Sequence, residues 1–127
     1  MKYYHVWFQT KMKRYVLLYD IDLRVHELFQ QVARENGYEL LAYETMPEHA
    51  HLLIGINSDE NLSEAVKRLK GISARRIFQE FPLLKQQIKS NNLWARRYAY
   101  KKVKKEALSN VIKYIRNQKK DLFYAPA

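Results

Sequence analysis

His49 and His51 lie two residues apart in a run, residues 49–56, whose composition is typical of a β-strand. Alternate residues of a strand share one face of a sheet, so both imidazoles are predicted to point the same way. Ala50 and Leu52 begin the opposite, apolar face, which is expected to meet the core. Neutral imidazole is a good ligand for zinc, manganese and similar ions. The spacing fits a pair of metal ligands, and two ordinary half-exposed histidines remain the alternative.

Tyr114 lies at the flank of an apolar stripe in a predicted C-terminal helix, four residues before Gln118. The stripe is made by four residues with helical spacing: Leu108, Val111, Ile112 and Ile115. Helix geometry puts Tyr114 about 110° and Gln118 about 70° from the centre of this stripe. The hydroxyl of Tyr114 is therefore predicted to reach solvent or a substrate. A boundary tyrosine with a solvated hydroxyl and no further role is the alternative.

A tyrosine hydroxyl, a histidine-bound ion and a side-chain amide would together suit phosphodiester chemistry. The phenol is a poor nucleophile near pH 7, because its pKa is about 10. It therefore needs an electrophile activated by a metal ion and help with its proton. In-line attack on a phosphate would give a phosphotyrosine ester, which stores the bond energy needed to rejoin strands.

Cations and aromatic rings alternate between residues 94 and 105, before the C-terminal helix. Rings stack on unpaired bases and cations follow the phosphate backbone of single strands. The candidate nucleic-acid contacts are Arg96, Arg97, Tyr98, Tyr100, Lys101, Lys102, Lys104 and Lys105, with Arg75 and Arg76 from an earlier predicted helix. The aromatic residues of this run share one strand face, so core packing is the alternative for them, and solvated surface is the alternative for the two arginines.

Charge and composition restrict the classes of function. The chain has 127 residues and a formal net charge of +10, with −3 over the first 63 residues and +13 over the rest. A basic excess in one half favours a polyanionic partner, most often nucleic acid, over a basic but inert surface. Without cysteine, disulfides, thiolate nucleophiles and cysteine-based zinc sites are excluded. We expect one cytoplasmic domain, residues 1–127, with no signal peptide and no membrane contact, since no apolar run reaches about 18 residues.

The remaining pattern predicts the elements that must position these residues. Strands are predicted over residues 3–10, 38–45, 49–56 and 93–103, and helices over 21–35, from 61 to about 81, and over 105–120. Asp20 is the predicted N-cap of the first helix, and Gly37 its left-handed stop. Asn61 to Glu64 resembles a capping box. Residues 83–92 are predicted to be irregular.

This order, β-α-β-β-α-β-α, predicts an α+β fold. Its first six elements match the ferredoxin-like or RRM-like split βαβ arrangement, an antiparallel sheet with two helices on one face. The C-terminal helix is an addition. The other face of the sheet is then either open or covered by that helix.

The same residues resemble a known family, the single-tyrosine transposases of insertion sequences of the two-hundred type. Residues 46–54, Met-Pro-Glu-His-Ala-His-Leu-Leu-Ile, are similar to the HUH motif of these enzymes, and residues 114–118 to their Tyr-x-x-x-Gln helix. Further similar residues are Tyr4-His5-Val6, Thr10-Lys11, Lys70-Gly71, Leu93-Trp94 and Tyr98. The resemblance covers nearly the whole chain in order.

The resemblance implies a function and a set of roles. His49 and His51 would be metal ligands with Gln118 as the third, and Tyr114 would be the nucleophile. The ion would be magnesium or manganese. The partner would be single-stranded DNA with hairpins near the element ends, and there would be no small-molecule substrate. A homodimer would cleave and rejoin this DNA through a 5′-phosphotyrosine intermediate. Family members often pack the tyrosine helix against the HUH site of the partner subunit. Action on DNA would also imply a location near the nucleoid of a prokaryotic cell.

The sequence departs from the family pattern at several positions, and it leaves other functions open. Ala50 is smaller than the usual valine, Arg97 stands where a glycine is expected, and residues 102–105 lack a common glycine. The basic sheet could bind single strands without cutting them. The two histidines could instead hold zinc in a hydrolase that uses water as its nucleophile. A host-adopted relative that processes repeated hairpins is a third alternative.

Overall fold

The chain folds around a four-stranded sheet with helices on both sides in a computed structural model that describes residues 1–118. In order, the elements are β1 (Lys2–Gln9), a 3-10 turn (Lys11–Lys13), α1 (Tyr19–Asn36), β2 (Glu39–Met46), β3 (His49–Ile56), α2 (Leu62–Glu80), α3 (Leu84–Ile88), β4 (Ala99–Val103), a second 3-10 turn (Lys105–Ala107) and α4 (Leu108–Arg116). The predicted α+β order is confirmed. The predicted last helix, residues 105–120, begins as the second 3-10 turn and is α-helical only from Leu108 to Arg116; its residues 119 and 120 lie outside the described residues.

The sheet has the strand order β2-β3-β1-β4, and every neighbouring pair is antiparallel. Pro47 and Glu48 form the turn between β2 and β3, where proline cannot donate to the ladder. The two central strands, β1 and β3, pair along their whole length, from Lys2 opposite Ile56 to Gln9 opposite His49. This long pairing fixes which side chains share each face.

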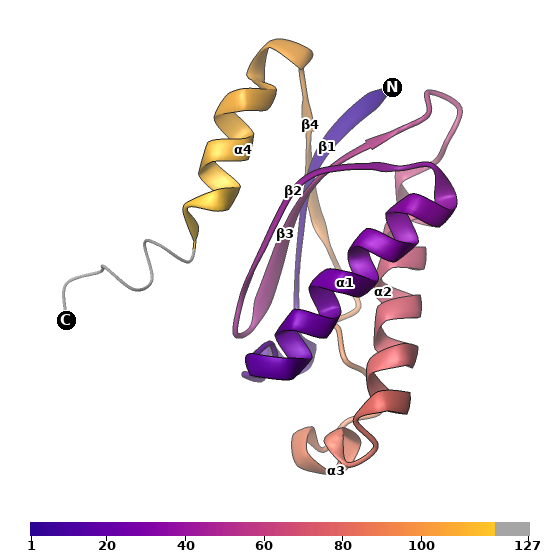
Figure 1. The fold of residues 1–127 in the computed structure, drawn as a ribbon, viewed down its shortest axis with the longest axis vertical. Coiled ribbons are helices and arrows are strands. Elements are labelled where there is room, and N and C mark those ends of the chain that lie inside the picture. The colour runs from indigo at the N-terminus through magenta and orange to yellow at the C-terminus, as the bar shows by residue number, and fades with distance from the viewer. Residues whose placement is uncertain (119–127) are drawn as a thin grey trace, which may run out of the picture.

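Helices α1 and α2 cover one face of the sheet, as predicted (Figure 1). The even-numbered residues of β3 meet them, and Ala50, Leu52, Ile54 and Ile56 are each no more than 1% exposed. The Asn61 side chain accepts a hydrogen bond from the Ser63 backbone N–H, which confirms the predicted cap of α2. Gly37 has φ of 71°, so the predicted left-handed end of α1 is also confirmed.

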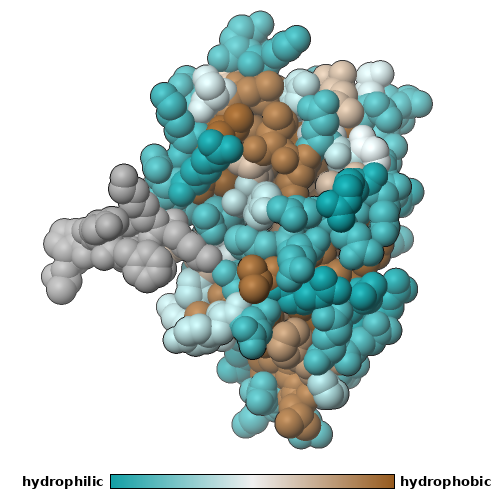
Figure 2. Space-filling model, viewed as in Figure 1, coloured by the Kyte–Doolittle hydropathy of each residue, from teal (hydrophilic) through white to brown (hydrophobic). Residues whose placement is uncertain are grey.

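Helix α4 covers part of the opposite face (Figure 1). Ile115 of α4 is fully buried in a small cluster with Ala42 of β2, Leu53 of β3 and Val103 of β4. Figure 2 shows apolar side chains in the upper part of the view, where α4 lies beside the sheet, and others at the lower end near α3. Of the two arrangements left open by the sequence, the structure has the covered one.

Three local predictions were wrong. Asp20 is not the N-cap of α1: the cap is Leu18 and Asp20 lies in the first turn, where a carboxylate still favours the helix dipole. Residues 84–88, predicted irregular, form α3. The last strand begins at Ala99 and not at residue 93. Trp94 before it makes only an isolated bridge to Thr10, because its ring is buried and donates to Ser73 Oγ at 2.9 Å.

Within residues 1–118, none of the helices combines the length and the apolar character that crossing a bilayer would require.

Candidate active site

His49 and His51 lie on the sheet face that carries α4, as the alternation of β3 predicted. His51 is opposite Trp7 of β1 and Glu44 of β2, and His49 is near the end of both ladders. The two rings have centroids 4.9 Å apart. His51 is 7% exposed and His49 is half-buried, so the pair borders solvent without lying fully in it.

Both imidazoles have their Nδ1 atom occupied by a hydrogen bond. His51 Nδ1 lies 2.9 Å from Nε2 of His5, and His49 Nδ1 lies 2.7 Å from the carboxylate of Glu48. Among the described residues, neither Nε2 atom has a hydrogen-bond partner. Histidine ligands usually bond through their second nitrogen to a neighbour in this way, so the donor set fits an ion held between the two Nε2 atoms.

Burial keeps His51 in the form that can bind an ion. Desolvation, together with the neighbouring His49 and His5, lowers the pKa of His51 from 6.5 to about 4. Burial, and then the charge of Lys101, lowers the pKa of His5. Because His51 stays neutral at pH 7, its lone pair is available without the loss of a proton.

Tyr114 of α4 lies beside this pair within the same chain. Its ring meets the His51 ring edge to face, with centroids 6.1 Å apart, and the His5 ring with centroids 5.8 Å apart. Tyr114 is 54% exposed while the next residue, Ile115, is fully buried. The predicted position at the flank of the apolar stripe is therefore confirmed.

Gln118 lies four residues after Tyr114, just past the end of α4 at Arg116, and its side chain turns back toward that helix. Its amide nitrogen donates to the Tyr114 carbonyl at 3.4 Å. Within residues 1–118, no group of three His, Cys, Asp or Glu side chains is arranged to hold a metal ion. Among the described residues, a third ligand beside the two histidines would therefore be of another type, such as an amide.

A cavity of about 450 Å³ opens beside Tyr114, between β4 and α4. Its lining includes His5 and Tyr114, together with three of the predicted nucleic-acid contacts: Lys101, Lys102 and Lys104. All three lysines are exposed. The cavity therefore joins a cationic strand directly to the aromatic and imidazole side chains of the candidate site.

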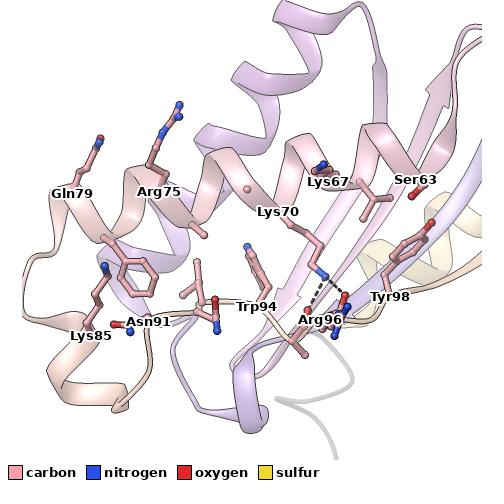
Figure 3. Close-up of a pocket in the computed structure, with 17 residues that line it drawn as sticks. Ser63, Lys67, Lys70, Arg75, Gln79, Lys85, Asn91, Trp94, Arg96 and Tyr98 are labelled. Atoms are coloured by element: carbon pink, nitrogen blue, oxygen red, sulfur yellow. Dashed lines mark hydrogen bonds between the residues drawn. The ribbon is translucent and has the colours of Figure 1, made fainter.

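A larger groove, of about 1010 Å³, runs between α2 and residues 91–98 (Figure 3). Its charged lining is basic only: Lys67, Lys70, Arg75, Lys85 and Arg96. A side chain at Gly71, in the middle of this lining, would meet nothing within 4 Å. Tyr98 closes one end. The volume, the basic charge and the open helix surface together suit a polyanion.

Lys70 shapes the groove instead of offering its charge to solvent. Its Nζ donates to three consecutive backbone carbonyls, those of Ala95 at 2.7 Å, Arg96 at 3.2 Å and Arg97 at 3.3 Å. Figure 3 shows the first two of these bonds. Burial lowers the pKa of Lys70. The ammonium therefore holds the segment before β4 against α2.

The other predicted contacts lie apart from both cavities. Arg76 Nε is 3.5 Å from the Glu80 carboxylate. Tyr100 is exposed on β4, with its ring beside those of Tyr4 and Tyr98. Arg97 and Lys105 are exposed but line neither cavity. The ten predicted residues thus fall into a groove set, a set beside Tyr114 and a remainder.

Sequence reasoning gave no role to two residues that the fold brings to the histidine pair, His5 and Glu48. Glu48 directly precedes His49, so its proximity was readable from the sequence. His5 is 46 residues from His51. Only the pairing of β1 with β3 brings them together. The one signal in the sequence was that His5 belongs to Tyr4-His5-Val6, which resembles the family.

Known proteins resemble the chain over nearly its full length. The family model described as "Transposase IS200 like" matches residues 1–118. The ISDra2 transposase TnpA of Deinococcus radiodurans is 33% identical over 115 residues, which are 91% of this chain and 82% of that relative. The transposase for insertion sequence element IS200 of Salmonella typhimurium is 24% identical over 91% of this chain and 75% of that relative.

Solved structures of transposases also resemble the chain. A crystal structure of a candidate transposase from Deinococcus radiodurans R1 matches with a TM-score of 0.76 and 37% identity, over 93% of this chain and 92% of that one. A REP-associated tyrosine transposase bound to a REP hairpin shares the fold, with a TM-score of 0.68, 15% identity, and coverage of 98% of this chain and 68% of that one. With its fold and a family match that runs from residue 1 to residue 118, the chain belongs to the IS200-like transposases.

Proposed function

We propose that this transposase cleaves and rejoins single-stranded DNA with Tyr114 as the nucleophile. The observation that carries the proposal is the position of the Tyr114 ring, 6.1 Å from that of His51 between their centroids, while the tyrosine remains 54% exposed. A phenol beside two imidazoles whose Nε2 atoms have no hydrogen-bond partner within residues 1–118 joins a nucleophile to a metal-binding donor set. Neither a simple binding module nor a structural tyrosine requires that arrangement.

Cleavage forms one bond and breaks one. The Tyr114 oxygen attacks the phosphorus of a phosphodiester, and the bond from phosphorus to the 3′ oxygen breaks. The 3′ oxygen leaves as a hydroxyl, and the tyrosine proton passes to solvent. The downstream strand remains attached as a 5′-phosphotyrosine. Attack by the 3′ hydroxyl of another strand reverses the step, so rejoining needs no ATP.

His49 and His51 would hold the ion through Nε2, with Gln118 as a third ligand after its side chain swings away from the Tyr114 carbonyl. When bound, magnesium or manganese supplies positive charge that offsets the charge developing on the phosphate. The chain itself supplies the rigid strand that orients the imidazoles and the helix that carries the phenol. Both imidazoles are prepared for this role by their Nδ1 hydrogen bonds.

Two basic surfaces support a DNA path. The cavity lined by Lys101, Lys102 and Lys104 adjoins Tyr114, so it suits the strand to be cut. The groove along α2, with Arg75 and Arg96, suits a neighbouring hairpin stem or single strand. The fold is shared with a transposase bound to a REP hairpin, which makes a hairpin the first substrate to try. We further expect a homodimer acting in the cytoplasm at the nucleoid.

The experiment that tests this function uses one hairpin-bearing DNA strand labelled separately at its two ends. With Mg²⁺ or Mn²⁺, the 3′-labelled fragment should become covalently attached to protein and the 5′-labelled fragment should be released with a free 3′ hydroxyl. A zinc hydrolase that uses water would release both fragments. A binding module would retard the strand and leave it intact.

A further inference from the structure

We propose that His5 is a positioning residue of the metal site: it accepts the Nδ1–H of His51 and so presents the His51 Nε2 lone pair to the ion. This inference rests on the proposed function, because it assigns a role toward the ion bound there. His5 itself would touch neither the ion nor the DNA in this role.

The contact between His5 and His51 is direct. His5 Nε2 and His51 Nδ1 are 2.9 Å apart, a typical distance for such bonds. The two rings are tilted by 32°, with centroids 5.2 Å apart. His51 is 7% exposed, so water has little access to compete for its Nδ1.

The direction of this bond decides whether His51 can bind an ion. A neutral imidazole carries one N–H, and the other nitrogen holds the lone pair. If His51 donates from Nδ1, its Nε2 lone pair is available to a metal. If His5 donates instead, the proton of His51 sits on Nε2 and blocks ligation. Metal binding therefore requires that His5 be the acceptor.

His5 is held firmly enough to impose an orientation. It lies on β1, which is paired on both sides, opposite Leu53 of β3 and Lys101 of β4. Its ring packs on the Trp7 ring, with centroids 4.7 Å apart. Glu48 makes the corresponding bond to Nδ1 of His49. The two metal-binding histidines would thus have one orienting partner each, a carboxylate and an imidazole.

The first test needs no variant and no metal. Long-range ¹H–¹⁵N NMR spectra of the wild-type protein at neutral pH report which ring nitrogen of each histidine carries the proton. The proposal predicts the proton of His51 on Nδ1 and the proton of His5 also on Nδ1. A proton on Nε2 of His51 would overturn it.

The second test compares two substitutions of His5 by their Mn²⁺ affinity, measured by electron paramagnetic resonance titration without DNA. In His5→Gln the amide oxygen can take the place of Nε2 as an acceptor, so affinity should stay within a few fold of wild type. His5→Phe keeps the ring but removes the acceptor, and affinity should fall about tenfold to a hundredfold. The matched control is His26→Phe, which removes a half-buried histidine bonded to Thr45 instead, and should leave Mn²⁺ affinity unchanged.

Failure of this inference is distinguishable from failure of the proposed function. Equal Mn²⁺ affinity in His5→Phe and wild type, with covalent DNA attachment intact in wild type, overturns the positioning role alone. Absence of covalent attachment in wild type overturns the function whatever the affinities are. If His5→Phe loses its thermal unfolding transition, the ring spectra of the wild-type protein decide the matter.

Discussion

The Tyr114 ring stands edge-on to the His51 ring of its own chain, at an interplanar angle of 84°. The two residues are 63 positions apart in the sequence, and α4 brings them together by packing on the sheet through Ile115. The candidate nucleophile is therefore held in place by a small apolar cluster, separate from the main core under α1 and α2.

The tyrosine should act on the histidine pair of its own chain. A mixture of two inactive variants, Tyr114→Phe and His51→Ala, should therefore stay inactive, because no active site in a mixed dimer has both groups from one chain. The measurement is covalent DNA attachment after the two proteins are unfolded together and refolded. Recovery of a substantial fraction of wild-type attachment would show that α4 crosses to the partner.

Ile115→Ala should loosen α4 more than it unfolds the protein. Removing a fully buried isoleucine side chain costs about 2–5 kcal/mol, and here most of that loss falls on the docking of one helix. The rate of DNA attachment should drop well below wild type at temperatures far under the unfolding transition. Ile112→Ala, at a half-buried position of the same helix, is the milder control. Equal rates for wild type and Ile115→Ala would show that docking of α4 does not limit the reaction.

The strands and helices that frame the site were largely predictable, and the exceptions have local causes. The alternation of apolar and polar residues in 49–56 predicted which side chains of β3 share a face. The helical spacing of apolar residues predicted the position of Tyr114 at the flank of their stripe. Residues 93–98 have the composition of a strand, yet they form none. The Trp94 ring is used in the core and Lys70 holds the carbonyls of the following residues, and neither contact can be read from a local pattern.

Arginines of the α2 groove should contribute to the salt dependence of DNA binding. Each cation that contacts a phosphate changes the slope of log K against log salt by about 0.7 to 0.9. Arg75→Ala and Arg96→Ala should each reduce the slope by about that amount. Arg76→Ala is the matched control, since Arg76 is paired with Glu80, and should leave the slope unchanged. If the slopes of Arg75→Ala and Arg96→Ala equal the wild-type slope, as that of Arg76→Ala should, the groove is excluded as a phosphate path.

Acid should destabilise the metal-free protein partly through His51. The pKa of His51 is lowered from 6.5 to about 4 by burial and by its histidine neighbours. As pH falls from about 6.5 to 4, the unfolded chain binds a proton at this position and the folded chain does not, so the free energy of unfolding decreases. Above this window both states are neutral, and below it both are protonated. The loss from this one group reaches at most about 3 kcal/mol.

The measurement is denaturant unfolding with a chelator at pH 7 and pH 4.5, for wild type and for His51→Asn. The asparagine can keep a hydrogen bond near His5 but does not titrate. All other groups are common to both proteins, so wild type should lose more stability than the variant on acidification. Equal losses would show that His51 titrates normally in the folded state.

The residues of the site divide by the range of the contacts that place them. His49, His51 and Glu48 are neighbours in one strand and its turn, so their proximity follows from the sequence. His5 reaches His51 only through the register of β1 with β3, and the groove needs α2 packed beside residues 91–98. Such contacts are set by tertiary packing, which a single sequence does not display.

The most direct test of the account asks which residue carries the DNA. Wild type, Tyr114→Phe and Tyr100→Phe, a control at another exposed tyrosine, are incubated with a hairpin-bearing strand and Mn²⁺, digested, and analysed by mass spectrometry. A nucleotide adduct should appear on the peptide that contains Tyr114 in wild type and in Tyr100→Phe, and on no peptide of Tyr114→Phe. Strand cleavage and rejoining that persist in Tyr114→Phe would contradict the account.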